Sequence, residues 1–243
     1  MYFHIVSIFP EIFNSFCESS LIQKAQQQSL ICIKTYNPRD WCEDKHKQVD
    51  DTVYGGGQGM LLKAEPYLRA VESILTTIQD LSTTRIILLS PSDLFFDQHV
   101  ATKYAQTYEH IIFICGRYEW IDHRFRLFLQ KTYPDIFCTM SLGKFVLLGG
   151  EVAAMTMVEA IARLIPWVIK EQMSWEEESY TPKHWLNNIE YPQYTRPRTV
   201  RGFEVPDILL SGHHKNIDDR KDSQTSWLDT ISQDEWNHDT KKD

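Results

Sequence analysis

The sequence predicts an α/β protein with a mostly parallel sheet, because short apolar runs alternate with longer segments of helical spacing over the first 165 residues. The apolar runs are rich in Ile, Val, Leu and Phe and are bounded by polar or turn residues, which is typical of strands buried on both faces. They cover residues 2–8, 31–35, 85–89 and 110–115. Apolar residues three and four positions apart predict helices over residues 67–78, 118–129 and 152–165.

The composition changes after Pro166, and this change predicts a second, smaller domain. Residues 1–166 form the predicted main domain. Residues 167–181 contain three consecutive glutamates at 176–178 without clear periodicity, which is usually a solvated linker. Residues 182–243 are punctuated by proline and become polar from His213 onward, so we expect a small, mainly helical C-terminal domain.

Charge and cysteine usage narrow the function classes. With 25 Lys and Arg against 33 Asp and Glu, the formal net charge is −8, which favours a soluble enzyme with a small substrate over a nucleic-acid binder.

The five cysteines form no C-x-x-C pair, the start lacks the basic segment of a signal peptide, and no apolar run reaches the ~18 residues of a membrane span. We therefore expect free thiols in a reducing cytoplasm and no membrane association. The sequence also lacks motifs for zinc, for a phosphate-binding P-loop and for a nucleophile elbow.

Three turns rich in small residues lie where strands are expected to end: Ser90-Pro91, Gly116 and the segment 142–150. In open α/β sheets ligands bind at the carboxyl ends of strands, and glycine lets a ligand approach the backbone closely. The sequence thus predicts one ligand pocket with glycine-lined walls, with a plain turn as the alternative interpretation of Gly116. A further glycine cluster, residues 54–60, misses the spacing of a nucleotide-binding loop and is better explained as a flexible lid.

Several segments, taken in order, are similar to one known family. They are IVSIFPEIF (5–13), NPRD (37–40), VDDTVYGGGQGM (49–60), LSPSD (89–93), CGRYEWID (115–122), SLGKFVLLGGEVAAMT (141–156), ARLIP (162–166), QYTRP (193–197) and EVPDILLSG (204–212). These segments resemble the bacterial tRNA (guanine-N1)-methyltransferase family of trefoil-knot, S-adenosylmethionine-dependent methyltransferases. The similarity covers nearly nine-tenths of the chain.

The resemblance implies a fold and a function that periodicity alone does not indicate. It implies transfer of a methyl group from S-adenosylmethionine to N1 of the guanine 3′-adjacent to the anticodon in tRNA. It also implies a deep trefoil knot at the C-terminal end of the main domain, a tRNA-binding C-terminal domain, and a homodimer with the active site at the subunit interface. The family further implies assistance by Mg²⁺, although no residue of this sequence indicates a metal site.

By position, the resemblance implies roles for individual residues. Glu178 corresponds to the carboxylate base that removes the N1 proton of guanine, and Arg163 to the guanidinium that stabilises the guanine oxygen. Glu119 corresponds to a carboxylate close to the guanine. The implied cofactor-binding positions are Ser90, Pro91, Gly116, Leu142, Gly143, Lys144, Phe145, Val146, Leu147, Gly149 and Gly150.

The chain departs from the family pattern at several of these positions. Glu178 stands where the family has Asp, and we expect reduced activity from the longer arm. Trp120 stands where the family has Gly, so an indole is expected to fill part of the pocket or to reorient Glu119. Lys144, Gln58, Ala153 and Leu148 replace Asp, Pro, Pro and Ser.

The C-terminal region differs most from the family in charge. Residues 213–243 carry five basic and eight acidic residues, a net charge of −3, and Arg196, Arg198 and Arg201 form the local basic cluster. We therefore expect weaker binding of tRNA than in a typical member. Two alternatives stay open: a diverged, catalytically weak or inactive paralogue that acts as a binding protein, and a knotted methyltransferase with another RNA substrate.

Overall fold

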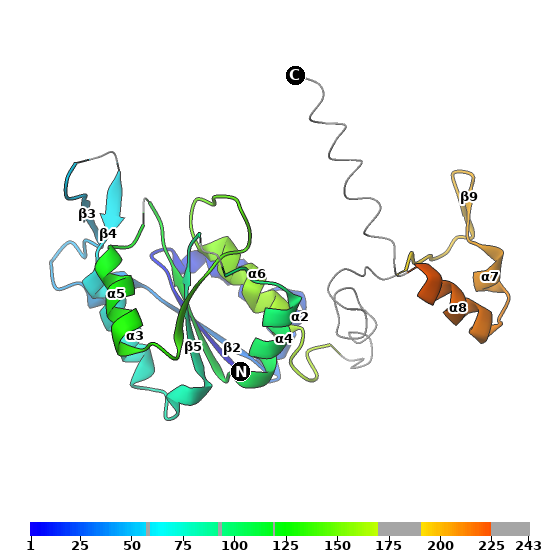
Figure 1. The fold of residues 1–243 in the computed structure, drawn as a ribbon, viewed down its shortest axis with the longest axis horizontal. Coiled ribbons are helices and arrows are strands. Elements are labelled where there is room, and N and C mark those ends of the chain that lie inside the picture. The colour runs from blue at the N-terminus through cyan, green and yellow to red at the C-terminus, as the bar shows by residue number, and fades with distance from the viewer. Residues whose placement is uncertain (57–58, 92–93, 119, 170–190, 225–243) are drawn as a thin grey trace, which may run out of the picture. The chain divides into compact units, whose positions relative to one another are not determined.

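The computed structural model describes residues 1–56, 59–91, 94–118, 120–169 and 191–224. The chain divides into two compact units, Met1–Lys170 and Glu171–Asp243. The first unit is built around a five-stranded sheet (Figure 1) of β1 (Tyr2–Val6), β2 (Cys32–Tyr36), β5 (Thr84–Leu89), β6 (His110–Cys115) and β7 (Phe137–Met140). The strand order is β2-β1-β6-β5-β7 and every neighbouring pair is parallel, which confirms the predicted parallel sheet.

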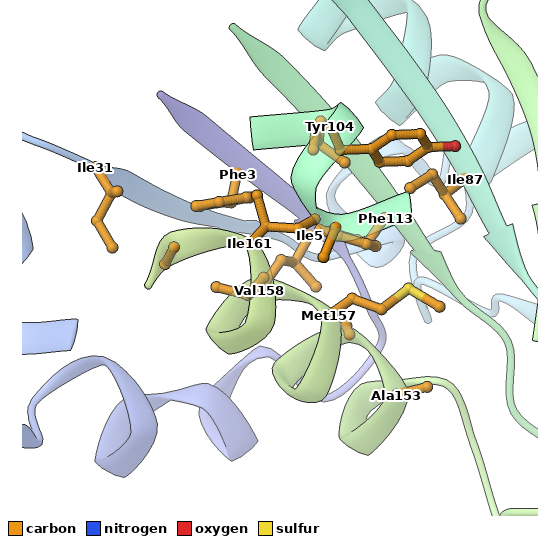
Figure 2. Close-up of a cluster of buried hydrophobic side chains, with 14 of the residues drawn as sticks. Phe3, Ile5, Ile31, Ile87, Tyr104, Phe113, Ala153, Met157, Val158 and Ile161 are labelled. Atoms are coloured by element: carbon orange, nitrogen blue, oxygen red, sulfur yellow. The ribbon is translucent and has the colours of Figure 1, made fainter. Parts of the chain in front are cut away.

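Successive side chains of these strands point to opposite faces of the sheet, and each face has its own buried core. One core joins Phe3 and Phe113 of the sheet with Val158 of α6 (Figure 2). The other joins Ile112 of the sheet with Tyr67 of α3. The first face is covered by α1 (Asn14–Cys17), α2 (Ser20–Gln27), α4 (Gln98–Thr107) and α6 (Glu151–Ala162), and the second by α3 (Ala64–Leu75) and α5 (His123–Thr132). Burial on both faces explains why β5 and β6 in particular are largely apolar runs.

Three helices lie close to the predicted ranges but have different bounds. The predicted helix 118–129 begins only at His123, because Asp122 caps α5 by accepting a hydrogen bond from the Arg124 amide (2.9 Å). The described residues before it, 116–118 and 120–122, form no helix. The predicted helix 67–78 begins earlier, at Ala64, with Pro66 in its first turn, where proline is tolerated. Three short 3₁₀ helices, η1 (Pro10–Phe13), η2 (Pro38–Trp41) and η3 (Leu81–Thr83), connect the larger elements.

A small hairpin, β3 (Asp50–Thr52) and β4 (Met60–Leu62), carries the glycine-rich segment predicted as a lid. Gly55 and Gly59 have φ values of +85° and +98°, a conformation that L side chains rarely adopt. Residues 57 and 58 lie outside the described residues. The hairpin is antiparallel and separate from the central sheet.

The second unit is described from residue 191 to residue 224. It contains a two-stranded hairpin, β8 (Thr199–Val200) and β9 (Phe203–Glu204), followed by α7 (Asp207–Leu210) and α8 (His214–Gln224). The hairpin was not predicted, because two strands of two residues leave no periodic signal. The domain boundaries at 166/167 and 181/182 stay a prediction, since residues 170–190 lie outside the described residues. In the part of the chain that the structure describes, no helix is long and apolar enough to cross a bilayer.

Candidate active site

A cavity of about 220 Å³ lies at the carboxyl ends of β5, β6 and β7. Nine of the eleven positions predicted to bind the cofactor line this cavity: Ser90, Pro91, Gly116, Leu142, Phe145, Val146, Leu147, Gly149 and Gly150. The other two, Gly143 and Lys144, line an adjoining hollow of about 580 Å³. The two hollows share four residues: Pro91, Ser141, Phe145 and Val146. The turns that the sequence places at separate strand ends therefore meet at one site.

Backbone hydrogen bonds hold the three turns together. The Ser90 amide donates to the Met140 carbonyl (3.1 Å), and the Ser141 amide donates to the Leu94 carbonyl (3.0 Å). The Gly150 amide then donates to the Gly116 carbonyl (3.0 Å). Segment 141–150 thus begins beside the turn after β5 and ends beside the turn after β6. These hydrogen bonds bring the three turns together around the cavity.

Gly150 is required by this close approach of backbones, because a Cβ atom there would lie 2.8 Å from the Cα atom of Cys115. Main chain cannot move aside, so a glycine at this position is a steric requirement for joining α6 to β6. A Cβ atom at Gly149 would instead overlap the Arg117 side chain at Nε, so a larger residue there would have to displace that side chain. Gly116 is different, because a Cβ atom there would make an ordinary contact of 3.7 Å with Ile121.

An ion pair between a cavity-lining arginine and a buried carboxylate lies at the wall of the cavity. Glu151, the first residue of α6, is 1% exposed, and its Oε2 atom accepts a hydrogen bond from Nε of Arg117 at 2.8 Å. Its Oε1 atom accepts a hydrogen bond from the Ser7 hydroxyl at 2.6 Å. Ser7 in turn accepts a hydrogen bond from the Phe9 amide (3.0 Å). The segment after β1, the turn after β6 and the start of α6 are thereby connected through one carboxylate.

Sequence reasoning missed this pair, although one signal was present. Glu151 opens a mostly apolar helix, and a carboxylate at a helix N-terminus interacts favourably with the helix dipole. The pairing with Arg117 across 34 positions leaves no local pattern. Next to the pair, burial first and then the Glu151 charge raise the pKa of the Cys115 thiol well above its usual range. Cys115 therefore stays protonated and is a poor nucleophile.

Two aromatic side chains stand at the wall of the cavity. Tyr118 and Trp120 both line it, and each is about half exposed. Tyr118 has a φ value of +59°, an uncommon conformation for a non-glycine residue. The cavity is open with the indole of Trp120 in place, so Trp120 narrows the site without closing it.

Comparison with known proteins identifies the family. Residues 1–233 match the family described as tRNA (Guanine-1)-methyltransferase TrmD. The chain belongs to this family. It is 44% identical over 214 residues to a tRNA (guanine-N(1)-)-methyltransferase of Carboxydothermus hydrogenoformans. This match covers 88% of this chain and 78% of the relative. A protein of the same name from Dictyoglomus turgidum is 45% identical, and the match covers 88% of this chain and 80% of that relative. Another from Clostridioides difficile is 41% identical, and the match covers 90% of each chain. The predicted enzyme class, a methyltransferase, is confirmed.

The three positions predicted to be catalytic differ in what the structure shows. Glu119 and Glu178 lie outside the described residues. Arg163 is the residue that ends α6, and its amide donates to the Glu159 carbonyl (3.1 Å). Because α6 begins at the cavity with Glu151 and rises 1.5 Å per residue, Arg163 lies about 18 Å along the helix from the cavity of its own chain.

The described residues give no direct support for a bound metal ion at the site. Among the described residues no group of three or more His, Cys, Asp or Glu side chains could hold a metal ion. Mg²⁺ therefore stays an implication of the family resemblance.

Proposed function

We propose that this chain transfers a methyl group from S-adenosylmethionine to N1 of the guanine 3′-adjacent to the anticodon in tRNA. One observation carries the proposal: nine of the eleven expected cofactor positions line a single cavity in a chain that belongs to the methyltransferase family. A tRNA substrate disagrees with the expectation drawn from the net charge of −8. Net charge is a property of the whole chain and says little about one local surface.

The residues around the cavity fit S-adenosylmethionine. Apolar side chains such as Leu142 and Leu147 suit the adenine ring and the thioether carbons, and the main chain near Gly116 supplies hydrogen-bonding groups. Gly149 and Gly150 line the same cavity and have no side chain to fill it. When bound, S-adenosylmethionine supplies a sulfonium methyl group, which is open to attack by a nucleophilic nitrogen.

The protein must remove a proton from that nitrogen before it can attack the methyl group. Guanine N1 carries a proton at neutral pH, so a carboxylate is needed to take it, and we assign this role to Glu178. Loss of the proton places negative charge on the guanine oxygen, which a guanidinium stabilises; we assign this role to Arg163. Glu119 follows Tyr118 of the cavity wall in sequence, and we assign it to holding the guanine.

We further propose that two copies of the chain build each active site. Arg163 lies about 18 Å along α6 from the cavity of its own chain, so a second copy is the simplest source of the guanidinium. Val146, Leu148 and Val152 are strongly exposed apolar residues in or after segment 141–150. Such a surface is typical of an interface between subunits. We also propose a trefoil knot at the C-terminal end of the main domain, as the family resemblance implies.

The small C-terminal domain predicted over residues 182–243 is proposed to bind tRNA, and the protein is proposed to act in the cytoplasm. Arg196, Arg198 and Arg201 lie in or next to the β8–β9 hairpin, and these cations suit phosphate contacts. Arg198 is partly neutralised, since its Nη2 atom forms an ion pair with Asp207 at 2.8 Å. Together with the acidic tail, this pair supports the expectation of weak tRNA binding.

A methyl-transfer assay tests the proposal. We expect transfer to a tRNA with guanine 3′ of the anticodon and none to the same tRNA with adenine there. Arg163→Ala and Glu178→Gln are each expected to lower kcat by about 100-fold or more, as for the loss of an electrostatic or acid–base group. Full activity in both variants would remove the mechanism. Cofactor binding without transfer to any tRNA would favour another RNA substrate, and no cofactor binding would favour the inactive paralogue.

A further inference from the structure

Among the described residues that line the cavity, Arg117 is the only one with a charged side chain. Building on the proposed function, we propose that Arg117, positioned by Glu151, binds the carboxylate of the methionine moiety of the cofactor. S-adenosylmethionine brings a carboxylate into a cavity whose other described walls are apolar side chains, small polar groups and main chain. An anion in such surroundings needs a cation or several donors, because burial without them is costly.

The guanidinium of Arg117 is held so that it can serve this purpose. It has five N–H donors, and the Nε donor is used by Glu151 at 2.8 Å. The terminal Nη1 and Nη2 groups carry the other four donors. A pair of terminal amino groups is the arrangement that binds a carboxylate through two parallel hydrogen bonds. Lys144 is a poorer candidate, because it lines the adjoining hollow and not the cavity itself.

Glu151 fixes the orientation of that guanidinium. Both of its carboxylate oxygens have partners, Arg117 on one side and Ser7 on the other, and the group is almost fully buried. The guanidinium carbon also lies 5.1 Å from the centre of the Phe9 ring, within the range of a cation–π interaction. Gly149 lets the main chain pass directly beside the same group. The arginine is thus already ordered before a ligand enters, which lowers the entropy cost of binding.

The proposal is tested with two ligands that differ in one group. S-adenosylmethionine and decarboxylated S-adenosylmethionine share the adenosine, the sulfonium and the amine, and differ in the carboxylate. By calorimetric titration, we expect the unmodified protein to bind the first about 10- to 100-fold more tightly, the range of a hydrogen bond to a charged group. In Arg117→Gln this ratio should fall to near one, mainly through weaker binding of the carboxylate-bearing ligand.

Further variants separate this role from a general loss of structure. Arg117→Gln leaves the buried Glu151 carboxylate without its cation, so the double variant Arg117→Gln/Glu151→Gln removes both charges and should fold while still showing a ratio near one. Arg117→Lys keeps the charge but loses the paired donors, and should give an intermediate ratio. Glu151→Gln alone should also lower the ratio, because the arginine loses its fixed position. As a matched control, Arg69→Gln alters another ion-paired arginine, on α3 and outside the cavity lining, and should leave the ratio unchanged.

Two outcomes would overturn the proposal, and they differ in meaning. If the unmodified protein binds both ligands and the ratio is the same in Arg117→Gln or in the double variant, the carboxylate is not bound by Arg117 and the proposed function stands. If the unmodified protein binds neither ligand, the assignment of the cofactor fails as well.

Discussion

The Leu62 amide donates a hydrogen bond to the Trp120 carbonyl at 2.9 Å, and the Asp122 amide donates to the Leu62 carbonyl at 2.8 Å. Leu62 ends β4, so this pairing extends the small hairpin into the loop after β6, next to Ile121. The hairpin carries the glycine-rich segment predicted as a lid. Main-chain hydrogen bonds therefore connect this hairpin to the wall of the cavity.

Trp120→Gly is expected to change cofactor affinity by less than about threefold, a difference below 1 kcal/mol. The hydrogen bond from Leu62 uses the carbonyl of residue 120 and does not need the indole. The cavity is already open with the indole present. Calorimetric titration with S-adenosylmethionine measures the effect. A gain of tenfold or more would show instead that the indole blocks the site, which would favour the alternative of an inactive paralogue.

Gly150→Ala is expected to lower the free energy of unfolding by about 1–3 kcal/mol, the usual cost of overpacking. The added methyl group would lie 2.8 Å from the Cα atom of Cys115, and main chain cannot move aside as a flexible side chain does. Urea denaturation measures the change. Gly116→Ala is the matched control, because its methyl group would meet Ile121 at an ordinary 3.7 Å. Equal stability of the two variants would contradict the steric argument.

The stability of the protein is expected to fall as the pH is lowered from 6.5 towards 4. Burial, followed by the neighbouring charges of His110 and Lys34, lowers the pKa of His4 from 6.5 to about 4. Between these values the unfolded chain binds a proton at His4 and the folded chain does not, so acid favours unfolding. Above pH 6.5 the two states bind the same number of protons there and the effect vanishes. The full loss is on the order of 3 kcal/mol.

His4→Gln separates this effect from the acid sensitivity of the carboxylates. Nδ1 of His4 lies 3.0 Å from the Tyr36 hydroxyl and Nε2 lies 3.1 Å from Nδ1 of His110, so glutamine keeps some hydrogen bonding without titrating. Unfolding free energies at pH 7, 5.5 and 4.5 should decline less steeply in the variant. Parallel pH profiles for the two proteins would contradict the low pKa of His4. Burial also lowers the pKa of His110, which acts in the same direction.

The sequence alone was sufficient to predict those elements whose signal lies in neighbouring residues. Strands β1, β5 and β6 are continuous apolar runs because both faces of the sheet are covered, and the glycine turns mark the strand ends that carry the cavity. Strand β7 has four residues, of which only Phe137 and Met140 are buried, so its run is too short to detect. Helix α4 buries only Ala101 and Tyr104 within a polar segment.

Features that depend on pairing between distant residues were not predictable in this way. The ion pair of Arg117 and Glu151 joins positions that are neighbours only after β6 and α6 have packed together. The start of α5 was misplaced for a similar reason, since the loop before it pairs with β4 and does not continue the helix. A knot has no periodic signature at all, and only family resemblance suggests it.

Mixing two inactive variants is expected to restore activity if each active site is shared between subunits. Arg163 stands at the end of α6 that is far from the cavity, whereas Glu119 adjoins Tyr118 and Trp120 of the cavity wall in sequence. In a mixed dimer of Arg163→Ala and Glu119→Gln, one site would combine an intact cavity side with an intact Arg163 from the other copy. Random exchange makes half of the dimers mixed, each with one complete site of two, so about one quarter of the unmodified rate should return. Methyl transfer is measured after the variants are unfolded and refolded together, with each variant refolded alone as the control. If Arg163 served the cavity of its own chain, no dimer in the mixture would hold a complete site, and the rate would stay at the level of the separate variants.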